Sequence, residues 1–353
     1  MKLENKIILE IIRDGENNDS LLAKHLNCRF GKEEVLGTLF LNRIAGYAYY
    51  KLKQFNANES LGRDFMNSLN AYVQYGISAN KKYKKNLRLL SEALQGIHCP
   101  YAILKGGILY DRFPPGVRVS NDIDVLVSEE DIDVFSSALE SKGFSQGYLK
   151  NGVFEEASRA EIIYSKMNKG ETVPFVKRLS SQKNDYLEID LNFSLDSTPQ
   201  SAQTAKRMLS DTAKMENGLL TLSPADFFIH LCAHLYKEAT SIFWVSKGRD
   251  LGLYKFLDIC YILKKISFKE KENIINRVQE LKTEHAFSYA VQCTNIIFGT
   301  SFFSEFGLET KEDISFPLKT VFASDKTEYR YNVPFLDWLF LKNRENVLTR
   351  SKQ

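Results

Sequence analysis

Two aspartates, Asp122 and Asp124, lie two positions apart in the apolar segment 120–127. The surrounding residues predict a buried strand, and residues i and i+2 of a strand project from the same face. Two ionised carboxylates so close together repel each other unless a cation lies between them. Mg²⁺ favours carboxylate oxygens combined with phosphate oxygens. The pair therefore indicates a site for one or two Mg²⁺ ions (or Mn²⁺) that hold a triphosphate, although Asp-x-Asp also occurs at solvated strand ends.

A third carboxylate is expected from the segment 186–193, which alternates strictly between apolar and polar residues. This alternation predicts a half-buried strand with one polar face. If the strand pairs beside the 122–127 strand, Asp190 on its polar face reaches the same metal ion. Glu188 shares that face and remains the alternative third carboxylate, as does an ordinary solvated face without a ligand.

The turn Lys105-Gly106-Gly107 falls between an expected strand at 101–104 and an expected helix at 108–112. Glycine lets the backbone approach a ligand closely, and the start of a helix directs free amides at an anion. Gly106 and Gly107 are therefore candidates for holding the phosphates of a nucleotide. Lys105 either adds positive charge to this site or is an ordinary surface lysine.

Four further side chains are candidates for substrate contacts. Arg118 lies in the Pro-Gly loop before Asp122, where it contacts a triphosphate or is a surface residue. His230 and His234 lie one turn apart on an expected helix, and Lys237 continues that face. A zinc site is disfavoured because no third ligand is evident. These three residues are expected either to line a cleft between domains or to be packed side chains.

The elements that position these residues divide the chain into three expected parts: a helical region at 1–97, a mixed core at 98–198 and a helical domain at 199–353. Apolar residues recur at three and four positions in the first and third parts, which predicts amphipathic helices. Further helices are expected at 153–168 and at 329–347. The predicted fold class is α+β, with a small mixed β-sheet core flanked by N-terminal and C-terminal helical regions.

The composition narrows the class of protein. The chain has 353 residues, of which 44% are hydrophobic, enough for one large core or two smaller ones. A net charge of +3 is small for this length and disfavours a nucleic-acid partner. Five cysteines without metal-ligand spacing favour reduced thiols. We expect a cytoplasmic protein without membrane attachment, because neither a signal peptide nor a long apolar run is evident. The oligomeric state is not predicted.

The order of these motifs resembles the DNA polymerase β-like nucleotidyltransferase superfamily. That superfamily has a Gly-Gly or Gly-Ser turn, a short helix, a strand with two spaced acidic residues, and a later strand with a third. The chain more specifically resembles a bacterial group of uncharacterised nucleotidyltransferase family proteins. The residues that carry this resemblance are Leu104-Lys105-Gly106-Gly107, Arg118 and Asn121 to Val127. Its members often lie in natural-product or peptide-modification gene clusters. The resemblance is specific over about residues 100–195.

The resemblance implies a role for each group of residues in the site. Asp122, Asp124 and Asp190 would hold the metal ions, while Gly106 and Gly107 would hold the leaving phosphates. Two features depart from the superfamily pattern. The second turn residue is Gly107 rather than the common serine, so a hydroxyl contact to phosphate is missing. The interval between the aspartate pair and Asp190 is long, so residues 128–189 are expected to contain inserted structure.

The implied activity is transfer of a nucleoside monophosphate, with AMP expected, from an NTP to a hydroxyl of a small molecule or peptide. Pyrophosphate is released. One alternative is an antitoxin-type protein AMPylase, although minimal versions of these enzymes are much shorter. The other is a catalytically inactive nucleotide-binding module, which the retention of three carboxylates disfavours.

Overall fold

The computed structural model describes residues 1–180, 185–195, 199–307 and 318–351, except for the side chains of Asn58, Pro199 and Gln200. Tertiary contacts divide the chain into two compact units. One unit joins Met1–Tyr75 to Leu231–Gln353, and the other is Gly76–His230. The boundaries fall inside two helices, α6 (Arg63–Ala93) and α11 (Pro224–Ala239). The three-part division expected from the sequence stays a prediction.

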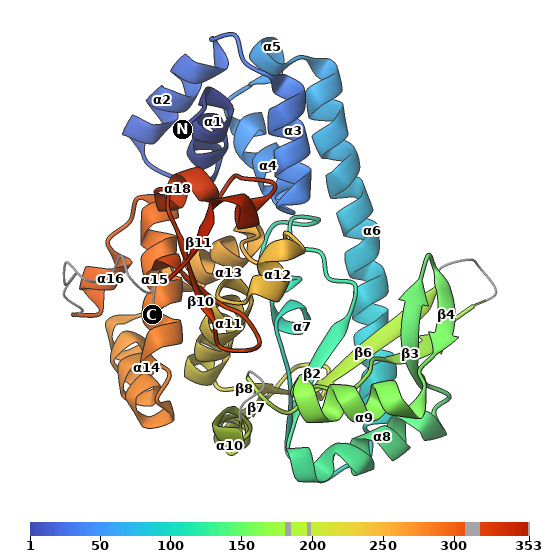
Figure 1. The fold of residues 1–353 in the computed structure, drawn as a ribbon. Coiled ribbons are helices and arrows are strands. Elements are labelled where there is room, and N and C mark those ends of the chain that lie inside the picture. The colour runs from blue at the N-terminus through green and yellow to red at the C-terminus, as the bar shows by residue number, and fades with distance from the viewer. Residues whose placement is uncertain (181–184, 196–198, 308–317, 352–353) are drawn as a thin grey trace. The chain divides into compact units, whose positions relative to one another are not determined.

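The unit Gly76–His230 is built on one mixed sheet, whose described strands follow the order β4-β3-β5-β6-β2-β1-β8-β7 (Figure 1). The strands are β1 (Tyr101–Ile103), β2 (Ile123–Val127), β3 (Ser145–Lys150), β4 (Val153–Glu156), β5 (Phe175–Arg178), β6 (Tyr186–Asn192), β7 (Thr212–Lys214) and β8 (Leu220–Leu222). Strands β2 and β6 pair in parallel, as do β1 and β8, and the other neighbours are antiparallel. This sheet, with helical regions at both ends of the chain, confirms the predicted α+β class.

Helices complete this unit, and two of them pack on the apolar face of the sheet. They are α7 (Gly106–Leu109), α8 (Ile132–Ser141), α9 (Arg159–Asn168) and α10 (Pro199–Met208), preceded by the C-terminal part of α6, with a 3₁₀ turn η1 (Glu129–Asp131). Tyr83 and Leu87 of α6 share one core with Phe135 of α8 and with Val125 and Ile189 of the central strands. All five residues of β2 are buried, so this strand is covered on both faces.

The segment 153–168 differs from its predicted helix. Residues Val153–Glu156 form β4, which pairs with β3, and α9 begins only at Arg159. Asn151 and Gly152 both have positive φ angles, 52° and 75°. Positive φ at both central residues is the requirement of the type I′ turn that joins hairpin strands. The Asn-Gly pair was therefore the sequence signal for this hairpin, and the helical interpretation of its second strand was wrong.

The unit made of Met1–Tyr75 and Leu231–Gln353 is largely helical, as predicted. The first part contributes α1 (Leu3–Ile12), α2 (Glu16–Leu26), α3 (Lys32–Leu41), α4 (Ala45–Gln54), α5 (Asn58–Leu61) and the start of α6. The second part contributes the end of α11, then α12 (Ile242–Ser246), α13 (Leu253–Leu263), α14 (Phe268–Leu281), α15 (Glu284–Phe298), α16 (Phe302–Glu305) and α18 (Phe335–Trp338). Arg13, directly after α1, donates to the carbonyls of Ile296 and Ile297 in α15. This contact links the two distant parts of the chain. Within the described ranges, every helix is too short or too polar to span a bilayer.

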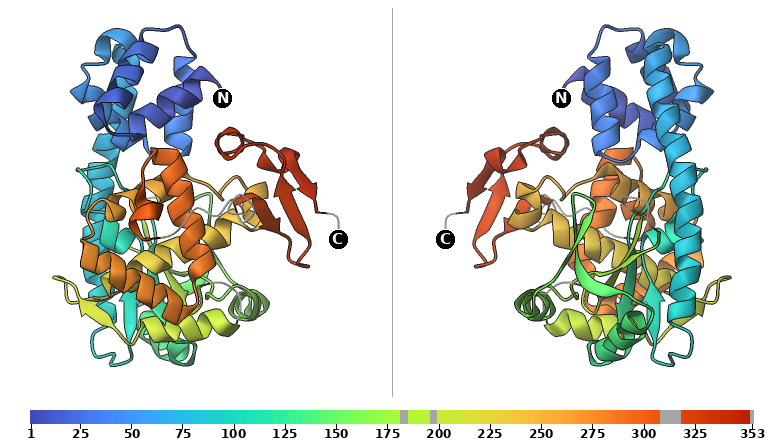
Figure 2. Two further views of the ribbon diagram at one scale, coloured as in Figure 1. Left: turned by 90° about the vertical axis from the view of Figure 1, so that its left-hand side faces the viewer. Right: turned by 90° about the vertical axis from the view of Figure 1, so that its right-hand side faces the viewer.

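The helix predicted over 329–347 is not formed. This region instead contributes to a small antiparallel sheet of β9 (Thr320–Phe322), β10 (Glu328–Tyr331) and β11 (Leu348–Arg350), with α18 and the 3₁₀ turn η3 (Arg344–Val347) between the last two strands. Figure 2 shows these strands, in red, as a separate sheet. Pro334 breaks the helical pattern, because proline lacks an amide donor and disfavours a helical residue before it. Tyr331 then stacks on Trp338 with ring centroids 3.9 Å apart.

Candidate active site

The candidate carboxylates are brought together by the pairing of β2 with β6. Asp124 is the direct parallel partner of Asp190, and the neighbouring pair is Ile123 with Ile189. Adjacent strands lie about 4.8 Å apart, so paired residues on one face are close neighbours. Asp122 and Glu188 each precede this pair by two positions and therefore share its face. The structure thus places Asp122, Asp124 and Asp190 on one face, and Glu188 beside them.

Burial and mutual repulsion raise the pKa values of Asp122, Asp190 and Glu188. Asp124 is 7% exposed, whereas Asp122 and Asp190 are half-buried. Desolvation and then the charge of Asp124 raise the pKa of Asp122. Desolvation and the charges of Asp124 and Asp122 raise the pKa of Asp190 well above its ordinary value. Desolvation also raises the pKa of Glu188, followed by the charges of Asp122 and Asp124. The cluster is therefore short of positive charge.

Lys105 supplies one positive charge to this cluster. Its Nζ lies 2.8 Å from Asp124 Oδ1, and its charge lowers the pKa of Asp122, against the larger effect of burial. The amide of Gly107 donates to the carbonyl of Leu104 at 3.0 Å, which closes a four-residue turn with Lys105 at its second position. Lys105 has a φ of 41° and a ψ of −111°. These angles are near those of the first central residue of a type II′ turn, a position dominated by glycine.

The two glycines after Lys105 are required by close packing. A Cβ atom on Gly106 would lie 2.2 Å from Ser120 Oγ, and one on Gly107 would lie 2.1 Å from Ile103 Cγ2. Helix α7, which starts here, has only four residues. Gly106 and Gly107 thus let the turn lie directly against β1 and the segment before β2. Their role in holding phosphates stays a prediction.

Three residues that contact the site were not singled out from the sequence. Ser120 Oγ donates to Asp122 Oδ1 at 3.4 Å, and the hydroxyl of Tyr83 donates to the carbonyl of Asp122 at 3.0 Å. Asn192 Nδ2 lies 3.5 Å from Asp124 Oδ1. Ser120 was visible as the polar residue before the aspartates, and Asn192 as the next residue on the polar face of β6. Tyr83 comes from α6 and had no local signal.

Arg118 is buried at 9% exposure, which excludes the interpretation as an ordinary surface residue. Its Nη1 donates to the carbonyl of Val119 at 2.8 Å. This contact folds the side chain back on its own loop. A contact between Arg118 and a triphosphate stays a prediction.

His230, His234 and Lys237 lie on α11 as predicted, but the boundary between the two compact units falls directly after His230. His230 is 5% exposed. His234 Nε2 lies 3.5 Å from Glu238 Oε2, one turn further along the helix. A substrate role for these three residues stays a prediction.

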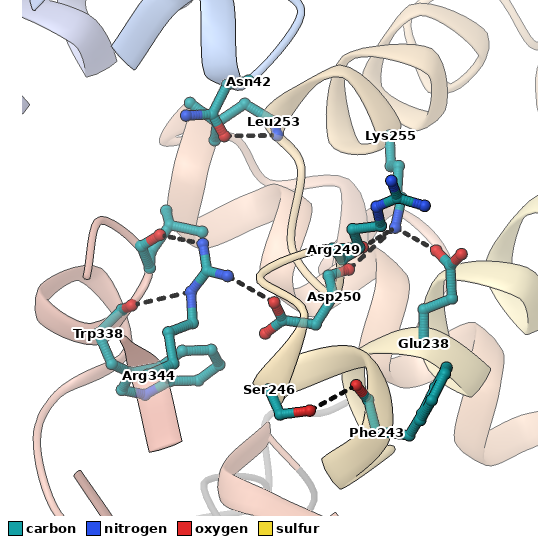
Figure 3. Close-up of polar contacts among 11 residues, drawn as sticks. Asn42, Glu238, Phe243, Ser246, Arg249, Asp250, Leu253, Lys255, Trp338 and Arg344 are labelled. Carbon is teal, nitrogen blue, oxygen red and sulfur yellow. Dashed lines mark hydrogen bonds and ion pairs between the residues drawn. The ribbon is translucent and has the colours of Figure 1, made fainter. Parts of the chain in front are cut away.

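Glu238 connects α11 to a buried polar network in its own unit (Figure 3). It forms an ion pair with Lys255, whose Nζ also donates to the carbonyls of Arg249 and Asp250. Asp250 is fully buried and is paired through its carboxylate with Arg344. These contacts fix the chain between α12 and α13, which gives them a structural role.

The chemistry of the acid cluster fits a divalent cation. Within the described residues, no three or more His, Cys, Asp or Glu side chains are already arranged as a set of metal ligands. The cluster nevertheless offers carboxylate oxygens from Asp122, Asp124 and Asp190 on a common face, and such hard oxygen donors suit Mg²⁺. The raised pKa values of Asp122 and Asp190 express the same deficit of positive charge that a cation would remove.

A known protein family matches most of this chain. The family described as "Uncharacterised nucleotidyltransferase" matches residues 30–299, a range that contains every candidate residue discussed above. Because the match covers well over half of the chain, the protein belongs to this nucleotidyltransferase family and is a transferase. No curated protein matches the sequence significantly. The predicted class of enzyme is therefore confirmed, and the family description names no substrate.

Proposed function

We propose that the protein transfers a nucleoside monophosphate, with AMP expected, from a metal-bound NTP to a hydroxyl of a small molecule or peptide. The observation that carries this proposal is the parallel pairing of Asp124 with Asp190, with Asp122 on the same face. Three acids on one face, beside a glycine turn, form a site for a cation and a triphosphate. Membership of the family supports the nucleotidyl transfer itself.

Asp122, Asp124 and Asp190 are the residues that would hold Mg²⁺ or Mn²⁺. When bound, the metal neutralises the charge of the triphosphate and lowers the pKa of the acceptor hydroxyl. Asp190 would either complete the metal site or accept the proton that the hydroxyl loses. The acceptor oxygen then forms a bond to the α-phosphorus, and the bond to the bridging oxygen breaks. Pyrophosphate leaves with that electron pair.

The remaining site residues would position the nucleotide. The ammonium group of Lys105 contacts the carboxylate of Asp124 and can reach phosphate oxygens near the metal. The backbone of Gly106 and Gly107 would approach the leaving phosphates, and Arg118 would add positive charge from the preceding loop. Holding the reacting groups in line and neutralising charge supply most of the rate gain in this kind of reaction.

The test is release of pyrophosphate from each of the four labelled NTPs with Mg²⁺, in the presence of hydroxyl-bearing small molecules, peptides or protein extracts. Asp122→Asn and Asp124→Asn are expected to lower turnover by roughly 10³-fold or more. The matched control is Asp133→Asn on α8, whose side chain is 92% exposed and which should keep full activity.

Three outcomes would change the proposal. Unaltered turnover in Asp122→Asn and Asp124→Asn would show that the site is assigned to the wrong residues. Failure of the wild type to bind any Mg-NTP in calorimetry would contradict an active enzyme. Label that appears only on a protein would replace the small-molecule acceptor with the AMPylase alternative.

A further inference from the structure

Lys105 has a backbone conformation that side chains rarely adopt. Its φ of 41° and ψ of −111° belong to a turn position that glycine normally fills, because a Cβ atom is strained there. Two glycines, Gly106 and Gly107, follow directly, yet the strained position itself carries a lysine. Strain of this kind persists where the surrounding structure imposes it, and it is concentrated at functional sites.

The turn that contains Lys105 is fixed to Asp124 in two ways. The amide of Leu104 donates to the backbone carbonyl of Asp124 at 3.0 Å, which fastens the turn to β2. The Lys105 ammonium then lies 2.8 Å from the Asp124 carboxylate. The two side chains are 19% and 10% exposed, so water screens this ion pair only in part. The strained conformation of Lys105 therefore places its ammonium group against the carboxylate of Asp124.

We propose that Lys105 is a resident counter-cation that neutralises Asp124 until a metal–nucleotide complex binds, and that it then moves to the phosphates. This inference rests on the proposed function and adds an order of binding to it. A divalent cation can bind the carboxylate oxygens of Asp124 only if it displaces the Lys105 ammonium group, which already contacts them. With nucleotide present, the displaced ammonium finds phosphate oxygens within the same site. Metal alone consequently binds weakly, and metal with nucleotide binds well.

Two other roles for Lys105 make different predictions. A lysine that only contacts phosphate leaves the affinity for metal alone unchanged when it is removed. A lysine that only supports the turn weakens metal binding when it is removed, because Asp124 loses its position. Only the counter-cation predicts that the loss of a positive charge strengthens the binding of metal alone.

The test measures the affinity for Mn²⁺ alone by electron paramagnetic resonance of the free ion. Lys105→Met removes the charge, and Lys105→Gly removes the charge while also suiting the turn, so that one variant keeps the local fold. Both are expected to bind Mn²⁺ roughly tenfold more tightly than the wild type, the scale of one charge-assisted hydrogen bond. A non-hydrolysable NTP analogue should then improve Mn²⁺ binding less in both variants than in the wild type. Lys84→Met, at an exposed position of α6, is the matched control and should leave Mn²⁺ affinity unchanged.

Unchanged or weaker Mn²⁺ binding in both Lys105 variants would contradict the proposed role of Lys105 as a counter-cation. A separate outcome concerns the proposed function itself. If Asp122→Asn and Asp124→Asn bind Mn²⁺ as the wild type does, the metal site is wrong, and the role of Lys105 is lost with it. If these two variants lose Mn²⁺ while the Lys105 variants do not gain it, the metal site holds and only the counter-cation fails.

Discussion

Asp124 of β2 and Asp190 of β6 are direct partners in a parallel strand pair, although β3, β4, β5, α8 and α9 intervene between them in the chain. In this register Glu188 lies beside Asp122, not beside Asp124. The two acids that compete for the third catalytic position therefore differ in which aspartate they accompany. Asp190 accompanies the aspartate that Lys105 also contacts.

This difference predicts unequal effects of two conservative substitutions. Asp190→Asn is expected to lower kcat by roughly 10²-fold or more, the usual contribution of a general base. Glu188→Gln should leave kcat within a few-fold of the wild type, because Glu188 lies at the Asp122 end of the cluster. Steady-state pyrophosphate release measures both, with thermal melting to establish that each variant folds. A larger loss in Glu188→Gln than in Asp190→Asn would assign the third carboxylate to Glu188.

The sequence predicted the part of the site that depends on local pattern. Alternation in the 186–193 segment identified the polar face that carries Asp190, and the burial of β6 follows that alternation. The spacing of Asp122 and Asp124 placed both on one face because strand geometry fixes it. The pairing of β2 with β6 does not follow from the sequence, because periodicity does not specify which strands become neighbours.

The contacts that did not follow from the sequence are those made across the fold. Tyr83 reaches the Asp122 carbonyl from α6, and Ser120 fills the space that Gly106 leaves open. Lys105 appeared as an unassigned charge, and its strained backbone is visible only in three dimensions. The hairpin turn at Asn151-Gly152, by contrast, had a recognisable local signal, and its second strand was still misread as helix.

Stability in the absence of metal should depend on pH through the acid cluster. The pKa of Asp190 in the folded chain is well above the ordinary 3.8, mainly because of desolvation, followed by the charges of Asp124 and Asp122. Between the two values the folded chain holds a proton that the unfolded chain has released, so rising pH favours unfolding. In EDTA, the melting temperature of the wild type should therefore fall as pH rises above about 4 through this window.

Asp190→Asn isolates this effect, because asparagine does not titrate. Its melting temperature relative to the wild type should increase as pH rises from 5 to 8 in EDTA, and saturating Mg²⁺ should reduce the difference. Melting by differential scanning fluorimetry across the pH range measures both. A difference that stays constant with pH would show that Asp190 is not perturbed in the folded chain.

The packing of the glycine turn predicts a steric effect at Gly106. Gly106→Ala would place a methyl group 2.2 Å from Ser120 Oγ, so the turn or Ser120 must move. Overpacking of this kind costs roughly 1–3 kcal/mol of stability, and the shift of Ser120 should also lower activity through Asp122. Urea denaturation and pyrophosphate release measure the two losses. Adding Ser120→Gly should restore stability, since it removes the atoms that the methyl group meets.

A matched control for Gly106 is Gly37, a helical glycine of α3 whose added Cβ would meet nothing within 4 Å. Gly37→Ala should raise the free energy of unfolding by about 0.5–1 kcal/mol, because alanine favours the helix. Equal effects of the two alanine substitutions would contradict the steric explanation.

The strained backbone at Lys105 predicts a difference between two variants that lose the same charge. Lys105→Gly relieves the positive φ of 41°, whereas Lys105→Met keeps it. The glycine variant should therefore be the more stable of the two by roughly 1–3 kcal/mol, the usual cost of such a conformation. Urea denaturation of both variants in EDTA gives this difference without any contribution from metal. Equal stabilities would mean that the turn relaxes around a side chain and stores no strain.

The buried ion pair between Asp250 and Arg344 predicts a large stability effect remote from the acid cluster. Asp250 is fully buried, and Arg344 also donates to the carbonyls of Trp338 and Leu339 (Figure 3). Arg344→Met would leave the Asp250 carboxylate without this cation, a loss that typically costs about 3–5 kcal/mol. The pKa of Asp250 is already raised by burial against the opposing charge of Arg344, so the single variant should be less destabilised at low pH, where the carboxyl can protonate.

The control for this pair is Arg330→Met, which breaks the more exposed ion pair with Glu328 on β10. Loss of a surface pair should cost no more than about 1 kcal/mol, because water and salt screen it. The double variant Arg344→Met with Asp250→Asn should recover part of the stability lost in Arg344→Met, since it removes the isolated buried charge. Urea denaturation measures all three. A double variant that is no more stable than Arg344→Met would mean that the loss comes from the carbonyl contacts of Arg344 rather than from Asp250.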